Sequence, residues 1–268
     1  MSIAQRIKQW PLIRSWLRQR ALKRFLSPAG VGYHAGRFRT FDEARAWLPP
    51  TPGFVHEDFT AEYIHQRSQA ISSFDYPVML WLERAFESGA RSLLDIGGSV
   101  GNQFYAYQRY LGYPSELRWC VYELPAFIAQ GRELAERRGA QALQFTDELH
   151  ASATDSDIWM AAGVLEFMED GQLPQLLDRA TRRPTHIILN KLPLHDGPDF
   201  VSTQNIGHGS FVPHWVYHRE TFIQQVVSRG YALVDAWDVH ERAFNSLGAA
   251  QDAFDSYSGL YFRATTPA

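Results

Sequence analysis

The sequence predicts an α/β protein built on a mostly parallel sheet of seven strands, with an N-terminal helical extension. From Arg91 onward, short apolar runs alternate with amphipathic stretches of helical spacing. This pattern is typical of a parallel sheet with helices on both faces. The 268 residues are 45% apolar, which is enough for a large core. Glycines directly follow the first apolar run, as in sheets that bind a ligand at the carboxyl ends of their strands.

The strands and helices of this sheet can be placed from the two periodicities. The expected strands are 92–96, 118–123, 142–146, 157–162, 186–190, 231–237 and 259–264, and the expected helices are 102–111, 125–139, 170–181 and 219–229. A loop-like stretch, not a helix, separates the last two strands. We therefore expect the final strand to be antiparallel and to close the sheet at its edge.

Two domains are predicted: a helical extension or lid over residues 1–89, and a ligand-binding domain over residues 90–268. The segments expected in the extension are two helical pieces broken at Pro11 (1–26), a glycine-rich connector (27–41), a short helix capped by Thr40 or Asp42 (42–48) and two helices that meet at Pro77 (60–88). Such helices commonly lie over the open edge of the sheet. We expect Tyr33, Phe38 or Tyr63 to contact the substrate from there.

Charge is unevenly distributed along the chain. Residues 1–26 contain seven basic residues and no acid, although the whole chain has a net charge of −3. The mildly acidic body argues against binding to duplex DNA. The basic segment, whose apolar residues include Trp16, Leu17, Ala21 and Phe25, is predicted either to pack on its own domain or to contact an anionic membrane surface or partner.

Cysteine usage and hydropathy bear on the cellular location. Cys120 is the single cysteine, so no disulfide can form within the chain, as expected in a reducing compartment. No apolar run approaches the length of about 20 residues that spans a bilayer. Pro11, Arg14 and Arg18 interrupt any signal-peptide core. These features predict a cytoplasmic protein.

The stretch LLDIGGSVGNQF (93–104) is the strongest motif. Gly97 and Gly98 allow a tight turn after the strand and leave no β-carbon in the way of a ligand, and Gly101 lets the next helix begin close to the strand. Dinucleotide-binding loops have the spacing G-x-G-x-x-G and hold a pyrophosphate. Here Asp95 stands two residues before the first glycine and would repel a pyrophosphate. An acid at this position suits a cationic ligand such as S-adenosylmethionine, which carries an ammonium and a sulfonium.

Acids also follow the next two predicted strands. Glu123 stands 22 residues after Gly101, close to the spacing of about 20 residues for ribose-binding acids in this architecture. A carboxylate there can accept hydrogen bonds from both ribose hydroxyls. Asp147 follows the third strand and is expected near the adenine amine. The alternative is that these acids only cap the following helices.

With these residues in place, the sequence resembles the class I S-adenosylmethionine-dependent methyltransferases, which have a Rossmann-like sheet. More narrowly, it is similar to a family of methyltransferases often encoded in bacterial surface-polysaccharide gene clusters. The resemblance covers roughly residues 90–264 and is carried by LLDIGGSVG (93–101), Glu123, FTDE (145–148), GVLEFMED (163–170), IILNKLPL (187–194), FVPHWVYHRETF (211–222) and GYALVDAW (230–237). A glycine is usual in the class where Ser99 stands.

The resemblance implies roles for the cofactor-binding residues. Asp95 and Gly97 would contact the methionine part, Glu123 the ribose, and Asp147 with Glu148 the adenine. The remaining residues of the expected cofactor site are Gly98, Ser99, Gly101, Leu124, Ala162 and Gly163. GVLEF would lie beneath the transferred methyl group. The expected reaction is methyl transfer to a small molecule, at an oxygen of a sugar or related metabolite.

An oxygen acceptor needs a general base, because a sugar hydroxyl has a very high pKa. His195, His208 and His214 are the candidates, with His56 and His65 as weaker ones. No HExxH motif, Cys/His pairing or carboxylate cluster indicates a metal. Two aromatic residues, Trp215 and Tyr217, are expected to line the acceptor site, because aromatic faces bind sugars and planar rings.

Two other functions remain open at this point. An NAD-dependent oxidoreductase or epimerase would have the dinucleotide glycine spacing and usually a Tyr-x-x-x-Lys pair, but none of Lys8, Lys23 and Lys191 lies four residues after a tyrosine. A non-catalytic module could retain the cofactor fold as a scaffold. Nucleic-acid methylation is disfavoured, because no Asn/Asp-Pro-Pro-aromatic motif follows the fourth strand.

Overall fold

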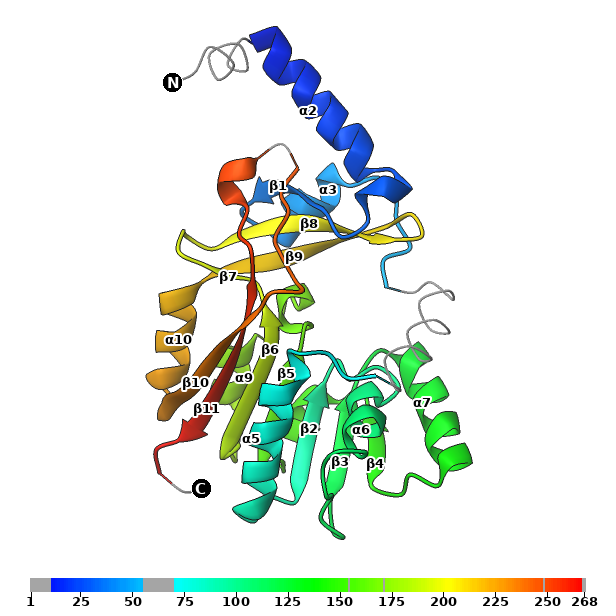
Figure 1. Cartoon of the computed structure of the whole chain (residues 1–268), viewed down its shortest axis with the longest axis vertical. Coiled ribbons are helices and arrows are strands. Elements are labelled where there is room, and N and C mark those ends of the chain that lie inside the picture. Colours follow the sequence, from blue (N-terminus) through cyan, green and yellow to red (C-terminus); the bar gives the residue numbers. More distant parts are fainter. Residues whose placement is uncertain (1–10, 55–69, 154, 171, 248, 267–268) are drawn as a thin grey trace.

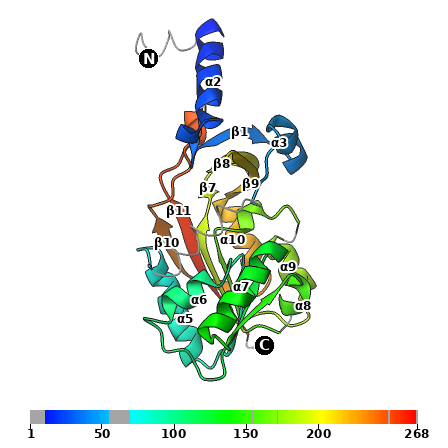
Figure 2. The ribbon, with the colours of Figure 1, turned by 90° about the vertical axis from the view of Figure 1, so that its right-hand side faces the viewer.

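A computed structural model describes residues 11–54, 70–153, 155–170, 172–247 and 249–266. These residues form a seven-stranded sheet with helices on both faces and a separate four-stranded sheet (Figures 1 and 2). The four-stranded sheet lies above the end of the large sheet at which the parallel strands finish. The arrangement places a second layer of chain over the predicted ligand edge.

The large sheet has the predicted α/β architecture. Its strands are β2 (Ser92–Ile96), β3 (Arg118–Tyr122), β4 (Leu143–Thr146), β5 (Ile158–Ala162), β6 (His186–Leu192), β10 (Tyr231–Val239) and β11 (Tyr257–Ala264), in the order β10-β11-β6-β5-β2-β3-β4. The five strands from β6 to β4 are parallel. The strand order reverses between β2 and β5, which is where ligands bind in open α/β sheets.

The final strand is antiparallel as expected, but its predicted place at the edge is wrong. Strand β11 pairs with both β6 and β10, so β10 forms the edge. The burial patterns explain this order. The first six residues of β11 are all buried, whereas β10 is buried only at its two end residues, with exposed and half-buried residues alternating between them. An apolar run fits a central strand, and an alternating one fits an edge with a solvated face.

Helices cover the two faces of this sheet. They are α5 (Asp75–Glu87), α6 (Asn102–Tyr107), α7 (Pro125–Arg138), α8 (Leu149–Ala153), α9 (Leu173–Arg179) and α10 (Arg219–Val227). Successive residues of β2 serve opposite faces, as the strand period requires. Leu93 packs in the core cluster shared with α5, α6 and α7, and Leu94 in the cluster shared with α8, α9 and α10.

Helix α5 belongs by sequence to the predicted extension, yet it packs on the large sheet through Val78 and Leu82. Pro77 lies in the first turn of α5, where the missing N–H costs no helical hydrogen bond. The predicted helical extension, residues 1–89, also contains a strand, His34–Phe38. The division of the chain at residue 89 stays a prediction.

The four-stranded sheet was not expected from the sequence. It consists of β1 (His34–Phe38), β7 (Leu194–His195), β8 (Phe200–Gly207) and β9 (Ser210–His218), in the order β1-β8-β9-β7. Strand β1 lies within the stretch that was predicted as a connector. Helix α3 (Phe41–Trp47) follows it and is capped by Thr40, one of the two predicted caps, whose hydroxyl accepts a hydrogen bond from the N–H of Glu43.

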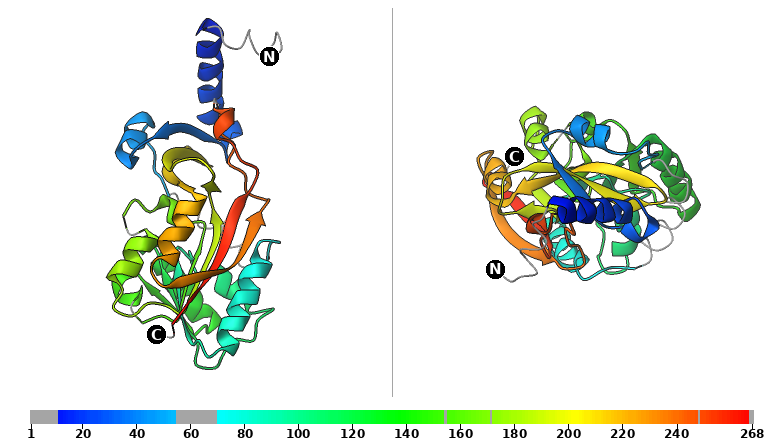
Figure 3. Two further views of the ribbon diagram at one scale, coloured as in Figure 1. Left: turned by 90° about the vertical axis from the view of Figure 1, so that its left-hand side faces the viewer. Right: turned by 90° about the horizontal axis from the view of Figure 1, so that it is seen from above.

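Helix α2 (Pro11–Phe25) projects away from the rest of the chain (Figure 3). Phe25, at its end, is fully buried and packs against Trp47 and Phe211. Trp16 is 56% exposed and Leu17 is also exposed. The expectation that this segment packs on its own domain is met only at the end of the helix. The first ten residues, for which the other helical piece was predicted, lie outside the described residues.

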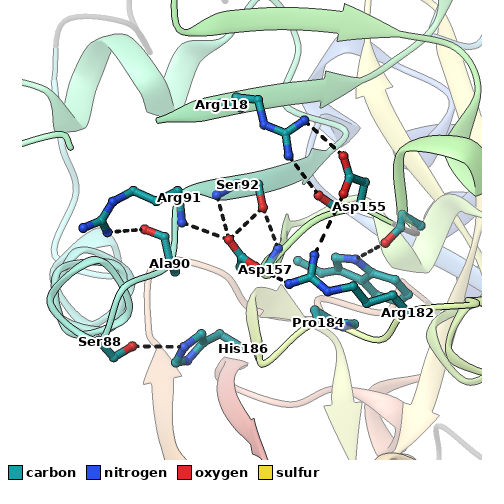
Figure 4. A network of polar contacts seen from close by, with 12 residues as sticks. Ser88, Ala90, Arg91, Ser92, Arg118, Asp155, Asp157, Arg182, Pro184 and His186 are labelled. Carbon is teal, nitrogen blue, oxygen red and sulfur yellow. Dashed lines mark hydrogen bonds and ion pairs between the residues drawn. The ribbon is translucent and has the colours of Figure 1, made fainter. Parts of the chain in front are cut away.

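The amino-terminal edge of the parallel strands is held by a network around Asp157 (Figure 4). Its carboxylate accepts hydrogen bonds from the N–H groups of Arg91 and Ser92, the Ser92 hydroxyl and the Arg182 guanidinium. Burial acts to raise the pKa of Asp157, but these hydrogen bonds outweigh it and lower the pKa to about 2. The network therefore joins β2 to β5 at the edge opposite the glycine turn.

Candidate cofactor and acceptor site

The glycine turn closes tightly at the carboxyl end of β2. Gly97 has a φ of +70°, and a β-carbon on it would lie 2.6 Å from Val164 Cβ. A β-carbon on Gly98 would lie 2.5 Å from Asp95 Cγ. Real β-carbons essentially never make such short contacts. Both positions therefore require glycine, and the backbone there is open to close approach by a ligand.

Ser99, the departure from the usual class pattern, adopts the left-handed conformation with a φ of +56°. Such a conformation is uncommon for a residue with a side chain and is found at functional sites. The Ser99 hydroxyl and the Asn102 side-chain amide are buried with no hydrogen-bond partner among the described residues. Gly101, with a φ of +88°, is the N-cap residue directly before α6. The loop therefore presents unpaired polar groups that a bound molecule could satisfy.

Asp95 is fully buried beside this loop. Its Oδ2 accepts a hydrogen bond from Trp119 Nε1 at 3.1 Å, and its Oδ1 has no partner within the described part of the chain. Burial raises the pKa of Asp95 to about 7, because the charged form loses its hydration. Glu123 raises the pKa further, whereas Trp119 and Lys191 lower it. An unpaired carboxyl oxygen in this setting is suited to receive a cationic N–H group.

Glu123 follows β3 and reaches across to the glycine loop. Its Oε2 accepts a hydrogen bond from the N–H of Ser99 at 3.1 Å, and its Oε1 accepts one from the N–H of Leu124 at 2.9 Å. Burial raises its pKa, although both hydrogen bonds lower it. Leu124 is exposed at the start of α7. Glu123 therefore does more than cap a helix, since it connects the ends of β2 and β3.

Asp147 and Glu148 follow β4 and are exposed. The N–H of Glu123 donates to the carbonyl oxygen of Thr146, so the two strand ends are adjacent. The negative charges of Glu123 and Asp147 both raise the pKa of Tyr122, after the larger effect of burial. The three acidic positions thus lie along one sheet edge, as the sequence predicts for an adenosyl group.

The end of β5 completes this edge. Ala162 is its last residue, and Gly163 has a φ of +78°. A β-carbon on Gly163 would lie 3.2 Å from Lys191 Cε, so the lysine side chain packs against this glycine. Lys191 is buried in β6 and has a φ of +58°. Sequence reasoning used Lys191 only to argue against a dehydrogenase and missed this position.

The three predicted histidine bases lie apart from one another in the four-stranded sheet. His195, in β7, accepts from the N–H of Gly197 through Nδ1 and therefore donates to Pro198 O from Nε2. Both of its ring nitrogens are thus used within a local turn. His208 is exposed, and with Gly209 forms the tip of the β8–β9 hairpin; both residues have positive φ. Such a two-residue turn is typical of hairpins.

His214 alone of the three is fully enclosed. It lies in the middle of β9, opposite Ser202 of β8, and its Nδ1 is 3.1 Å from Trp215 O. Since a carbonyl oxygen only accepts, Nδ1 carries the proton and Nε2 is a lone pair. Nε2 has no partner among the described residues. Burial lowers the pKa of His214 to about 4, so the ring is neutral at neutral pH.

His214 belongs to a cluster that the sequence did not reveal. We call Glu166, His34, His214 and Tyr257 the inner polar cluster. Glu166 lies in the short helix η2 (Leu165–Phe167) that follows β5, and it is 4% exposed. The only sequence signal was an acid within the otherwise apolar run GVLEF.

The structure shows the neighbours of four other predicted contact residues, whose contact with an acceptor stays a prediction. Tyr217 donates its hydroxyl proton to Leu165 O, and Trp215 packs against Phe41. The Tyr33 hydroxyl accepts from Arg24, and Phe38 packs against Trp47. Three further candidates lie outside the described residues: His56, His65 and Tyr63.

No set of three or more His, Cys, Asp or Glu side chains that could hold a metal ion is present in the described ranges. Within the same ranges, no helix has both the length and the apolar character needed to cross a bilayer.

Together, the sheet order and the glycine turn define the Rossmann-like fold of the class I S-adenosylmethionine-dependent methyltransferases. No family model and no curated protein sequence matches the chain. Solved structures share its fold. An S-adenosylmethionine-dependent methyltransferase from Clostridium acetobutylicum aligns with a TM-score of 0.51 and 8% identity, over 78% of this chain and 98% of that one. The mitomycin 7-O-methyltransferase MmcR aligns with a TM-score of 0.50 and 18% identity, over 95% of this chain and 72% of that one.

Proposed function

We propose that the protein is an S-adenosylmethionine-dependent methyltransferase that acts on an oxygen of a small molecule, a sugar or related metabolite. The observation that carries this proposal is the glycine turn with Asp95 buried behind it and Glu123 at the next strand end. Within the described ranges, Asp95 Oδ1 has no hydrogen-bond partner. The shared fold supports the proposal, and one structural neighbour is by name an O-methyltransferase.

The residues present fit this cofactor. Asp95 would receive the ammonium group and Glu123 the ribose hydroxyls, and Asp147 with Glu148 would contact the adenine edge. The glycine loop around the cofactor would be shaped by Gly97, Gly98, Ser99 and Gly101. The borders of the cofactor site would be formed by Leu124, Ala162 and Gly163. When bound, S-adenosylmethionine supplies a methyl group whose transfer breaks the carbon–sulfur bond, returns the electron pair to sulfur and releases the acceptor's proton. The protein's part is to position the acceptor and to take that proton.

Calorimetric titration with S-adenosylhomocysteine and, separately, with NADH tests the proposal. We expect S-adenosylhomocysteine to bind with a micromolar dissociation constant and NADH to give no heat of binding. Binding of NADH alone would favour the oxidoreductase. Binding of S-adenosylhomocysteine without methyl transfer to any acceptor would favour the non-catalytic module. A role in surface-polysaccharide synthesis, which rests on sequence resemblance alone, and a cytoplasmic location stay predictions.

We also propose that helix α2 rests on an anionic membrane surface. Its 15 residues include five basic residues and no acid, and it carries Trp16, Leu17 and Leu22 exposed on a helix that projects from the body (Figure 3). Basic and aromatic residues together favour binding to anionic lipid. We expect the protein to sediment with phosphatidylglycerol vesicles but not with phosphatidylcholine vesicles, and to be released by added salt. Equal sedimentation with both lipids would contradict this proposal.

A further inference from the structure

We propose that Glu166 takes the proton from a hydroxyl of the acceptor, which His214 and His34 hold from the four-stranded sheet. The inference rests on the proposed function and adds to it the catalytic base and the acceptor class. It is carried by the inner polar cluster, whose members come from η2, β1, β9 and β11.

The first step is that this cluster contains unpaired buried polar atoms. Glu166 Oε2, His214 Nε2 and His34 Nδ1 have no hydrogen-bond partner among the described residues, and all three side chains are at least nine-tenths buried. Buried polar atoms are nearly always hydrogen-bonded in folded proteins. Three such atoms in one cluster indicate a place for a polar molecule.

The second step is that the two histidines are neighbours and that η2, which carries Glu166, packs against β9, which carries His214. The His34 and His214 rings are 5.0 Å apart, and His34 Nε2 is 3.2 Å from the Tyr257 hydroxyl. The ring of Phe167, the residue after Glu166, is 5.9 Å from that of His214. The charge of Glu166 acts on Tyr257, and the charge of Arg242 acts on Glu166, His34 and Tyr257 alike.

The third step is the position of the cluster relative to the cofactor edge. Glu166 lies four residues beyond Ala162, at the carboxyl end of β5. Lys191 packs against Gly163, and its charge acts on both Asp95 and Glu166. Asp95 and Glu166 thus both feel the charge of Lys191 at the carboxyl end of the sheet, which is the end where the methyl donor is expected.

The fourth step is the choice of Glu166 over His214 as the base. Burial raises the pKa of Glu166 to about 7, whereas burial lowers that of His214 to about 4. A base is most effective when its pKa lies near the working pH, so Glu166 is the stronger proton acceptor. The charged or titratable groups whose interactions with Glu166 are resolved are Lys191, Arg242, Tyr217 and Tyr257.

The acceptor class follows from the same atoms. His214 Nε2 is a hydrogen-bond acceptor, so it suits a second hydroxyl of the same molecule. We therefore take the acceptor to be a molecule with at least two hydroxyls, one for Glu166 and one for His214. The proton leaves the acceptor oxygen as that oxygen gains the methyl group, and it moves to Glu166 Oε2, which becomes a neutral carboxylic acid and later loses the proton to water.

Two measurements test the inference, with Glu166→Gln compared to Glu169→Gln. Glu169 lies in the same segment, is exposed and pairs with Arg45 on the surface. Infrared difference spectra of the protein saturated with S-adenosylhomocysteine need no acceptor. We expect wild type and Glu169→Gln to lose one carboxylic-acid band as the pH rises through about 7, and Glu166→Gln to lack that band. The same band in Glu166→Gln would overturn the assignment.

The second measurement follows transfer of radiolabelled methyl groups to a panel of methyl glycosides and to amino sugars. We expect a glycoside to be methylated, with kcat about a hundredfold lower in Glu166→Gln, unchanged in Glu169→Gln, and S-adenosylhomocysteine affinity unchanged in both. The methylation rate of the wild type should fall as the pH drops below about 7, and this fall should be absent in Glu166→Gln. Full activity in Glu166→Gln, or methylation of amines alone, would overturn the inference. If the wild-type protein did not bind S-adenosylhomocysteine at all, that result would instead overturn the proposed function.

Discussion

Replacing Glu123 by alanine is expected to weaken S-adenosylhomocysteine binding on the order of a thousandfold. A carboxylate that bonds two ribose hydroxyls contributes about 1.5–3 kcal/mol for each charge-assisted hydrogen bond. Removing both corresponds to a loss of about 3–6 kcal/mol, or at least a hundredfold in affinity. The variant also loses the support that Glu123 gives to the N–H of Ser99 in the glycine loop. Calorimetric titration of both proteins measures the effect.

The control for this variant is Glu136→Ala. Glu136 lies on α7, the helix that begins just after Glu123, and it is exposed. Both variants remove one negative charge, but only Glu123→Ala changes a residue at the end of strand β3. We expect Glu136→Ala to bind like the wild type. Wild-type affinity in Glu123→Ala would mean that the ribose is not held there.

Replacing Asp95 by asparagine is expected to weaken binding about a hundredfold at pH 8, because truncating one partner of a buried charge pair costs about 2–5 kcal/mol. The wild-type affinity should also depend on pH. The pKa of Asp95 in the free protein is raised to about 7, so the carboxyl is largely neutral below that pH. A bound ammonium favours the carboxylate, so binding releases a proton below pH 7 and strengthens as the pH rises through 7.

S-adenosylhomocysteine is the right probe for this effect, because it has the ammonium group but no sulfonium. Titrations in two buffers of different ionisation enthalpy give the number of protons released. We expect close to one proton at low pH for the wild type and none for Asp95→Asn. Asp42→Asn, which removes an exposed carboxylate on α3, should match the wild type. Wild-type affinity that stays constant between about pH 5 and 8 would contradict this role of Asp95.

The large sheet was predictable because its strands carry local signals. Strands β2, β5 and β6 are almost entirely buried, so each appears in the sequence as a short apolar run, and the glycines after β2 mark the ligand edge. The acids at 95, 123 and 147 could be grouped from sequence alone, since the carboxyl ends of parallel strands meet at one edge. The place of β11 between β6 and β10 required tertiary pairing that no local pattern specifies.

The four-stranded sheet was missed because its strands contain buried polar residues. Ser202, Thr203, Asn205 and His214 are all buried in β8 and β9, so these strands lack an apolar run. The Thr203 hydroxyl donates to Ala35 O of β1, a residue far away in sequence. The inner polar cluster was missed for the same reason, because His34 and His214 become neighbours, and η2 packs against β9, only once this sheet has formed over the end of β5.

The structure of the protein crystallised with S-adenosylhomocysteine tests the central claim most directly. The account predicts that the ribose hydroxyls lie within hydrogen-bonding distance of Glu123 and that the ammonium group lies beside Asp95 Oδ1. A ligand bound anywhere else, or one that leaves both carboxylates without contact, would contradict it.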